Sequence, residues 1–313
     1  MSEPDIRLPP GPTGKWMPTV SFMRDTHGTL DKWVAKFGDP ILVDALNGPI
    51  VLTGRPDLIE TIFKADPAIF ETFAKHTLRP ILGDGSMLQL DGEPHRRERK
   101  LIMPMFHGQR MSSYVDAMQR IAIRSFDSYS ESGTVSMLDI TTAISLGVIV
   151  EVILGADNED AAATLVQQSA EVTERTWPMF FFSPKAQFRF LGISPWDRFE
   201  DIRRELRENV VKEIRKRESS LEGREDILSL LVGARYEDGS AMELEHLLDE
   251  VGTFLFAGHE TSALAMAWAV YYLLNNPESL EQLVAELDAN VDKPPSEIAV
   301  SYTHLTLPTI CSV

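Results

Sequence analysis

An apolar run over about residues 242–274 is interrupted by a polar break, Ala257-Gly258-His259-Glu260-Thr261-Ser262. The length and composition of the run predict one long, buried helix. Polar groups left unpaired in such a helix cost roughly 1–3 kcal/mol each, so the break must either find partners in the core or face a reaction centre. A membrane span is the weaker interpretation, because His259 and Glu260 lie near the middle of the run, where charge is expensive in lipid.

The rest of the chain predicts a mainly α fold with a small β portion. Near the start, two apolar triplets flank Asn47-Gly48 and predict a β-hairpin. Helices are expected over 30–37, ending at Gly38, and from Pro56 to about Ala65, whereas 70–91 loses its periodicity and predicts a long functional loop. Later apolar residues recur at helical spacing and predict helices over about 93–106, 109–131, 138–155, 160–176, 196–219, 225–234, 241–275 and 277–289.

Charge and cysteine content narrow the possible partners and compartment. The 47 acidic residues outnumber the 30 basic ones, for a net charge of −17, which argues against a nucleic acid or an anionic membrane as the main partner. The one cysteine, Cys311, allows no internal disulfide and fits a reducing cytosol. The acidic, polar start of the chain predicts neither a signal peptide nor an anchor. The sequence therefore predicts a cytoplasmic protein with no transmembrane segment.

Two local patterns carry candidate chemistry. In the break, Gly258 removes a side chain from one helix face, while Thr261 offers a hydroxyl and Glu260 an exchangeable proton. Such breaks also occur in ordinary helix packing, so this pattern alone leaves both interpretations open. Near residue 95, His95 and Arg99 are four apart on a predicted helix and can together grip a pair of carboxylates.

Three further basic residues, Arg96, Arg97 and Lys100, surround that pair. A basic row of this kind indicates a solvated helix face, and it could also help to dock an acidic protein partner. The aromatic, proline-broken stretch 177–194, which contains Phe181, is either a hydrophobic loop packed on the core or a lid over an apolar ligand.

Common catalytic motifs of other classes are excluded. A zinc protease needs a second histidine three residues after the His-Glu pair, and the residue after Ser262 is Ala263. The sequence has no dinucleotide-binding glycine motif after a predicted strand, no phosphate loop and no serine-nucleophile elbow.

Together the motifs resemble those of the cytochromes P450, the haem-thiolate monooxygenases. The likeness rests on Asp91-Gly92-Glu93-Pro94-His95 with Arg99, then Pro104-Met105-Phe106, and the break at 257–262 some 160 residues later. It extends over most of residues 8–290 and is greatest for soluble bacterial members. The resemblance predicts a cytochrome P450 fold over residues 1–300.

The resemblance implies a role for each matching residue. His95 and Arg99 would bind the propionates of haem b, and Ala257 and Gly258 would leave room for dioxygen and substrate. Glu260 and Thr261 would be the catalytic acid–alcohol pair that delivers protons in a dry site.

The resemblance also implies the reaction and its partners. The substrate would be an apolar small molecule, contacted by Met87, Leu88 and Phe181. The reaction would insert one oxygen atom of O2, with electrons from a separate ferredoxin or flavoprotein, since no reductase module is visible.

The end of the chain departs from the family pattern. The family's axial cysteine lies in a Phe-x-x-Gly-x-x-x-Cys-x-Gly segment after a Glu-x-x-Arg helix, and neither motif is present, so Cys311 does not qualify as the iron ligand. Residues 301–313 resemble a translated sequencing adapter and are predicted to be non-native. We therefore expect a C-terminally truncated enzyme that binds haem weakly, tends to aggregate and is inactive as written. The alternative is a non-catalytic α-helical binding protein for an apolar small molecule.

Overall fold

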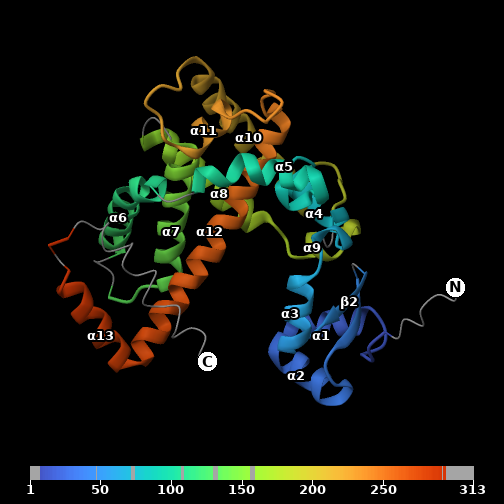
Figure 1. The fold of residues 1–313 in the computed structure, drawn as a ribbon. Helices are drawn as coiled ribbons and strands as arrows, with labels where there is room; N and C mark the ends of the chain where they lie inside the picture. The colour runs from blue at the N-terminus through green and yellow to red at the C-terminus, as the bar shows by residue number, and fades with distance from the viewer. Residues whose placement is uncertain are drawn as a thin grey trace. The chain divides into compact units, whose positions relative to one another are not determined.

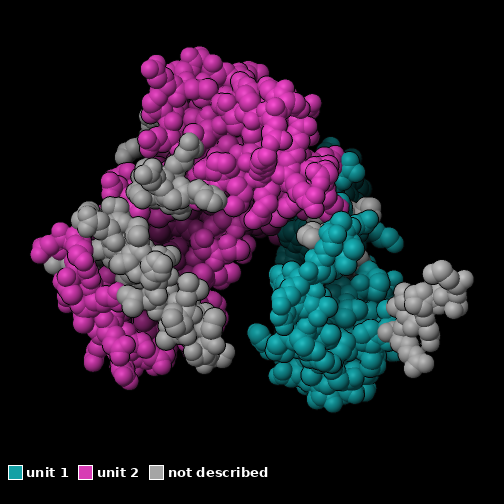
Figure 2. Space-filling view, in the orientation of Figure 1, with its two compact units in different colours: residues 1–81, 177–196 teal, residues 82–176, 197–313 magenta. Residues whose placement is uncertain are grey.

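The computed structural model describes residues 8–46, 48–71, 75–106, 109–129, 133–155, 159–290 and 292–293. They belong to two compact units (Figure 2). Unit 1 comprises Met1–Ile81 and Trp177–Trp196, and unit 2 comprises Leu82–Thr176 and Asp197–Val313. A single domain over 1–300 stays a prediction, and the proposed non-native tail, 301–313, lies outside the described residues.

Unit 1 contains the predicted hairpin and the short early helices. Strands β1 (Ile41–Ala45) and β2 (Gly48–Leu52) pair antiparallel, with Val43 opposite Ile50. Helix α2 (Thr26–Phe37) begins where Asp25 accepts a hydrogen bond from the Gly28 amide (2.9 Å) and ends at Gly38, whose φ of +87° favours glycine. The other helices of this part are α1 (Trp16–Arg24), α3 (Pro56–Lys64), α9 (Met179–Phe182) and most of α4 (Lys75–Leu82).

The prediction of an irregular loop over 70–91 is wrong in part. Helix α4 (Lys75–Leu82) and a 3-10 turn, η2 (Met87–Gln89), lie within it. Pro80 interrupts the helical pattern in the sequence, yet burial of Ile81 and Leu82 favours a helix despite the lost hydrogen bond. Helix α1 was also not predicted.

The helices predicted for unit 2 are confirmed, with ends that differ by a few residues. The predicted 93–106 helix is α5 (Gly92–Ile102) followed by a 3-10 turn, η3 (Met103–Phe106). Helix α7 (Met137–Ile149) continues into a π-helical turn, η4 (Val150–Leu154). The main helices are α5 (Gly92–Ile102), α6 (Gln109–Tyr129), α7 (Met137–Ile149), α8 (Glu159–Arg175), α10 (Pro195–Ser219, which starts in unit 1), α11 (Ile227–Gly233), α12 (Leu244–Asn275) and α13 (Pro277–Asp288).

In unit 2, α7 packs along α12 (Figure 1). The core lies around the first half of α12, where Leu154 of η4 and Ile227 and Leu228 of α11 are fully buried together with Val251 and Leu255 of α12. Within the described part of the chain, the stretch that is long and apolar enough to cross a membrane is Met137–Leu154, and not the run in α12. Its packing against α6, α8 and α12 is that of a core helix.

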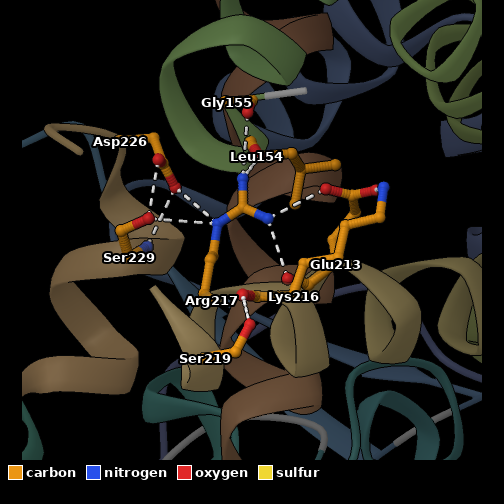
Figure 3. Close-up of polar contacts among 8 residues, drawn as sticks. All are labelled: Leu154, Gly155, Glu213, Lys216, Arg217, Ser219, Asp226 and Ser229. Carbon is orange, nitrogen blue, oxygen red and sulfur yellow. Dashed lines mark hydrogen bonds and ion pairs between the residues drawn. The ribbon is translucent and has the colours of Figure 1, made fainter. Parts of the chain in front are cut away.

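A fully buried arginine ties α10 to the neighbouring elements (Figure 3). The Arg217 guanidinium donates to the carboxylates of Glu213 (2.9 Å) and Asp226 (3.1 Å). It also donates to the carbonyl oxygens of Leu154 and Gly155 at the end of η4. Nothing in the sequence pattern predicted this network, because a single arginine near a helix C-terminus is usually solvated.

Candidate functional site

The polar break in α12 divides between two faces of the helix. His259 is on the inner face and is only 3% exposed. Its Nδ1 lies 2.7 Å from the Leu255 carbonyl oxygen and its Nε2 lies 3.0 Å from the Thr173 hydroxyl of α8. The Ser145 hydroxyl of α7 donates to the His259 carbonyl (2.7 Å). This residue therefore satisfies its polar atoms in the core and joins three helices.

Gly258 also faces the neighbouring helix. A Cβ built at this position would lie 2.0 Å from Cδ1 of Ile149 in α7. The glycine thus permits close packing of α7 and α12, which is the ordinary helix-packing role that the sequence pattern leaves open. The predicted role, leaving room for dioxygen and substrate, stays a prediction with no support from this contact.

The outer face of α12 carries the other residues of the break. Ala257, Glu260 and Thr261 are all exposed, and the same row continues to Leu264, 42% exposed. The Thr261 hydroxyl donates to the Ala257 carbonyl (2.7 Å). Among the described residues, the Glu260 carboxylate has no hydrogen-bond or ion-pair partner. The acid and the alcohol therefore stand together on one open surface.

The row continues as an exposed aromatic surface towards the end of α12. Trp268, Tyr271 and Tyr272 are each more than half exposed, and their ring centroids lie 5.4–5.8 Å apart. Monomeric proteins rarely leave so continuous an apolar surface in water. This face is therefore suited to being covered by a ligand or by further protein.

His95 and Arg99 lie one turn apart on α5, as predicted. His95 is half-buried and Arg99 is exposed. Within the part of the chain that the structure describes, neither side chain makes a hydrogen bond or an ion pair. Their donors are therefore available to an anionic ligand.

The turn that follows α5 reaches the same side of α12. Phe106 packs edge-on against Phe254, with ring centroids 5.6 Å apart. Phe254 lies one turn before Ala257 in the same row of the helix. The α5 pair and the outer face of α12 thus belong to one connected part of unit 2.

The other basic residues of α5 have carboxylate partners within the chain. Arg97 pairs with Asp238 (2.9 Å), Arg96 with Glu93 and Lys100 with Glu237. All of these pairs are solvent-exposed. This arrangement is consistent with the predicted solvated face of α5. The pairing also neutralises the positive charge of these three residues, which would otherwise attract an acidic protein.

The predicted substrate residues have different surroundings. Met87 packs partly buried against the core of unit 2, whereas Leu88 is 46% exposed. Phe181 is half-buried in α9 of unit 1. Their contact with a substrate stays a prediction.

Several buried polar groups near this site were not predicted from the sequence. Asp249 and Glu250 of α12 are buried, as are Gln89 after α4 and Glu98 of α5. The signal for the first two was present, since a pair of carboxylates interrupts an apolar helix pattern there.

The cytochrome P450 family matches residues 9–305 of the chain. The match reaches residue 305, beyond the boundary predicted near 300. A Mycobacterium tuberculosis protein provisionally named cytochrome P450 138 is 29% identical over 291 residues, which cover 91% of this chain and 65% of that protein. A second protein of that organism, provisionally named cytochrome P450 135A1, is 28% identical over 283 residues. This match covers 88% of this chain and 63% of that protein.

A solved structure, that of retinoic acid bound cyanobacterial CYP120A1, superimposes with a TM-score of 0.78. It is 20% identical in sequence, and the match covers 91% of this chain and 64% of that one. This likeness shows the fold. The chain spans less than two thirds of the length of these relatives.

Proposed function

Because the chain belongs to the cytochrome P450 family, we propose that the protein is a haem-dependent monooxygenase that inserts one oxygen atom of O2 into an apolar organic substrate. The proposal concerns the whole protein, since the chain spans 65% or less of its relatives' length. Haem b, iron protoporphyrin IX, is the cofactor that the family implies. When bound, it supplies the iron centre at which dioxygen is activated.

The observation that carries the proposal is the unengaged His95–Arg99 pair. A haem has two propionate carboxylates, and two hydrogen-bond donors one turn apart on the same helix face, an imidazole and a guanidinium, suit them. The remaining basic residues of α5 are already paired with Glu93, Asp238 and Glu237. The residues present therefore fit the cofactor, and His95 and Arg99 would hold it.

The outer face of α12 supplies groups that can move a proton. The Thr261 hydroxyl donates to the Ala257 carbonyl, which leaves its oxygen lone pairs free to accept. A rotation about χ1 would let the same hydroxyl donate outwards. The exposed Glu260 carboxylate next to it can take up and return a proton, which supports the proposed acid–alcohol pair.

The remaining parts of the proposal rest on the family. Electrons would come from a separate ferredoxin or flavoprotein, and the protein would act in the cytoplasm. An apolar substrate is supported by the exposed apolar row of α12 that ends in Trp268, Tyr271 and Tyr272. The axial cysteine is not assigned, because Cys311 lies outside the described residues and outside the family's cysteine motif.

The competing function is a non-catalytic binding protein for an apolar small molecule. It would use the same surface of α12 without iron chemistry, and its His95–Arg99 pair would hold a ligand carboxylate. The two functions differ in whether haem is bound, so haem content separates them.

The test uses a gene completed with its genomic sequence downstream of residue 300. We expect a thiolate-type Soret band in the carbon monoxide difference spectrum of the reduced protein. Arg99→Leu and His95→Leu should each lower haem retention several-fold. Arg96→Leu is the matched control, because Arg96 is on the same helix and paired with Glu93, and it should retain haem. A completed protein with no Soret band would refute the proposal.

A further inference from the structure

The segment 83–90 is attached to the first turns of α12 by buried polar contacts. The Gly85 amide donates to Asp249 Oδ2 (3.0 Å) and the Met87 amide donates to Glu250 Oε1 (2.6 Å). The Thr253 hydroxyl donates to the hydroxyl oxygen of Ser86 (2.7 Å), which is fully buried. One turn of α12, at Asp249 and Glu250, thus holds Gly85 and Met87, and the next turn, at Thr253, holds Ser86 between them.

Two glycines let the segment approach the helix this closely. Gly83 has a φ of +88°, and a Cβ there would lie 2.1 Å from the Asp249 carboxylate. A Cβ on Gly85 would lie 2.6 Å from the backbone Cα of His246. The segment, which carries the exposed Leu88, is therefore in a defined position.

Glu250 is the unusual member of this contact. Its side chain is fully buried, and Oε2 has no hydrogen-bond partner among the described residues. Glu98 of α5 is only 6% exposed and likewise leaves its own Oε2 without a partner, while its Oε1 accepts from the Tyr236 hydroxyl (2.6 Å). A fully buried carboxyl group with an unpaired oxygen favours the neutral, protonated form of Glu250, and a second buried carboxyl group nearby favours it further.

The charged groups around Glu250 do not neutralise it. Asp249 adds a second negative charge from α12, and its cation partner, Arg207 of α10, also pairs with Glu245. Arg97 lies over the ring of Tyr236, 4.0 Å from its centroid, and His246 is one turn away on α12. None of these cations makes an ion pair with Glu250 or Glu98 in the part of the chain that the structure describes.

We propose that Glu250 positions the 83–90 segment by accepting the Met87 amide as a protonated acid. The inference deepens the proposed function and rests on it, because the segment carries Leu88, a predicted substrate contact. Protonation leaves Glu250 Oε1 free to accept from the Met87 amide. Loss of the proton to water leaves a buried carboxylate without a cation, close enough to Glu98 and Asp249 to be repelled by them, and this favours release of the segment.

The electrostatics agree with this arrangement. Burial raises the pKa of Glu250 to about 8, against the lowering effect of the Met87 amide, and the charges of Glu98 and Asp249 raise it further. At pH values between the ordinary glutamate pKa and about 8, the state in which the segment is held against α12 (closed) then binds one more proton than the released state (open). Closure is therefore favoured at the low end of this range and is lost as the pH rises through it, by up to about tenfold per pH unit.

Amide hydrogen exchange at Met87 in the chain as given tests the inference. Protection factors, which are corrected for the intrinsic pH dependence of exchange, are measured between pH 5 and pH 9.5. In the unsubstituted chain, we expect protection at 85–88 to fall with pH and to level off above about pH 8. Glu250→Gln keeps a neutral acceptor of the same shape, so its protection should not vary with pH. Glu278→Gln, an exposed glutamate on α13, is the matched control and should behave like the unsubstituted chain.

Three results would overturn the inference. The first is that protection at 85–88 falls with pH in Glu250→Gln just as it does in the unsubstituted chain. The second is that Glu250→Gln shows no protection at any pH. The third comes from Glu98→Gln, which keeps an acceptor for Tyr236 but removes the neighbouring charge. We expect it to move the levelling-off point to lower pH, and an unchanged point would show that the charge of Glu98 does not act on Glu250, contrary to the inference. These readouts need no haem, so their failure is distinguishable from failure of the proposed function.

Discussion

Replacing Arg217 with methionine should destabilise unit 2 far more than replacing an exposed arginine on the same helix. The substitution keeps much of the side-chain volume but removes all donors from a site that is fully buried. Glu213 and Asp226 are each less than a tenth exposed; Asp226 loses its cation partner, and Glu213 loses one of its two. Removing one partner of a buried ion pair typically costs about 3–5 kcal/mol.

The remaining contacts place the expected cost near the lower end of that range. Glu213 keeps the Lys216 ammonium (2.6 Å), and Asp226 keeps the amide and the hydroxyl of Ser229 (2.9 and 2.7 Å). Because each carboxylate retains a donor, we expect the free energy of local unfolding to fall by about 3 kcal/mol. This corresponds to a change on the order of a hundredfold in the local folding equilibrium.

Hydrogen exchange of peptides from α10 and α11 measures this loss without assuming a two-state transition, which a chain of two units need not obey. The control is Arg204→Met, whose partner Asp201 is also exposed (2.7 Å), and an exposed pair contributes at most about 1 kcal/mol. If Arg217→Met lowers protection no more than Arg204→Met does, the network contributes little and the reasoning is wrong.

Four further predictions concern α12 and α5. Gly252→Ala, with open space around its Cβ, should stabilise α12 by up to about 1 kcal/mol. Gly258→Ala should instead destabilise it by about 1–2 kcal/mol in thermal unfolding, and Ile149→Val, which removes the overlapping Cδ1, should relieve that cost. In a completed enzyme, Thr261→Ala should uncouple oxygen consumption from product formation, and unchanged coupling would count against its role. Lys100→Glu should leave reduction by an acidic donor unchanged at low salt, since Lys100 is already paired; a marked slowing would restore the docking interpretation.

Local sequence rules predict most of the helices, because these depend on neighbouring residues. The hairpin around Gly48, the end of α2 at Gly38 and the start of α3 at Pro56 follow from backbone preferences that no tertiary contact overrides. Helix α4 was missed because burial of Ile81 outweighs the preference of Pro80 against a helix.

The partners of buried polar groups could not be predicted in this way. The Glu98–Tyr236 and Met87–Glu250 hydrogen bonds join residues that are 138 and 163 positions apart. Their identities are visible in the sequence, but their pairing depends on how α5 and α12 pack. The His95–Arg99 pair could therefore be predicted from its local spacing, whereas the partners of the buried carboxyls beside it could not.

The break in α12 shows why one motif can carry both structural and chemical roles. Residues three or four apart share a helix face, so His259 falls in the row of Leu255 and Ala263 and is buried with them. Glu260 and Thr261 fall in the row of Ala257 and Leu264 and remain exposed. The core contacts of His259 fix the rotation of the helix about its axis, and that rotation determines which side the acid and the alcohol face. A substitution at His259 should therefore change the direction in which Glu260 and Thr261 face, although His259 itself lies on the opposite, buried side of the helix.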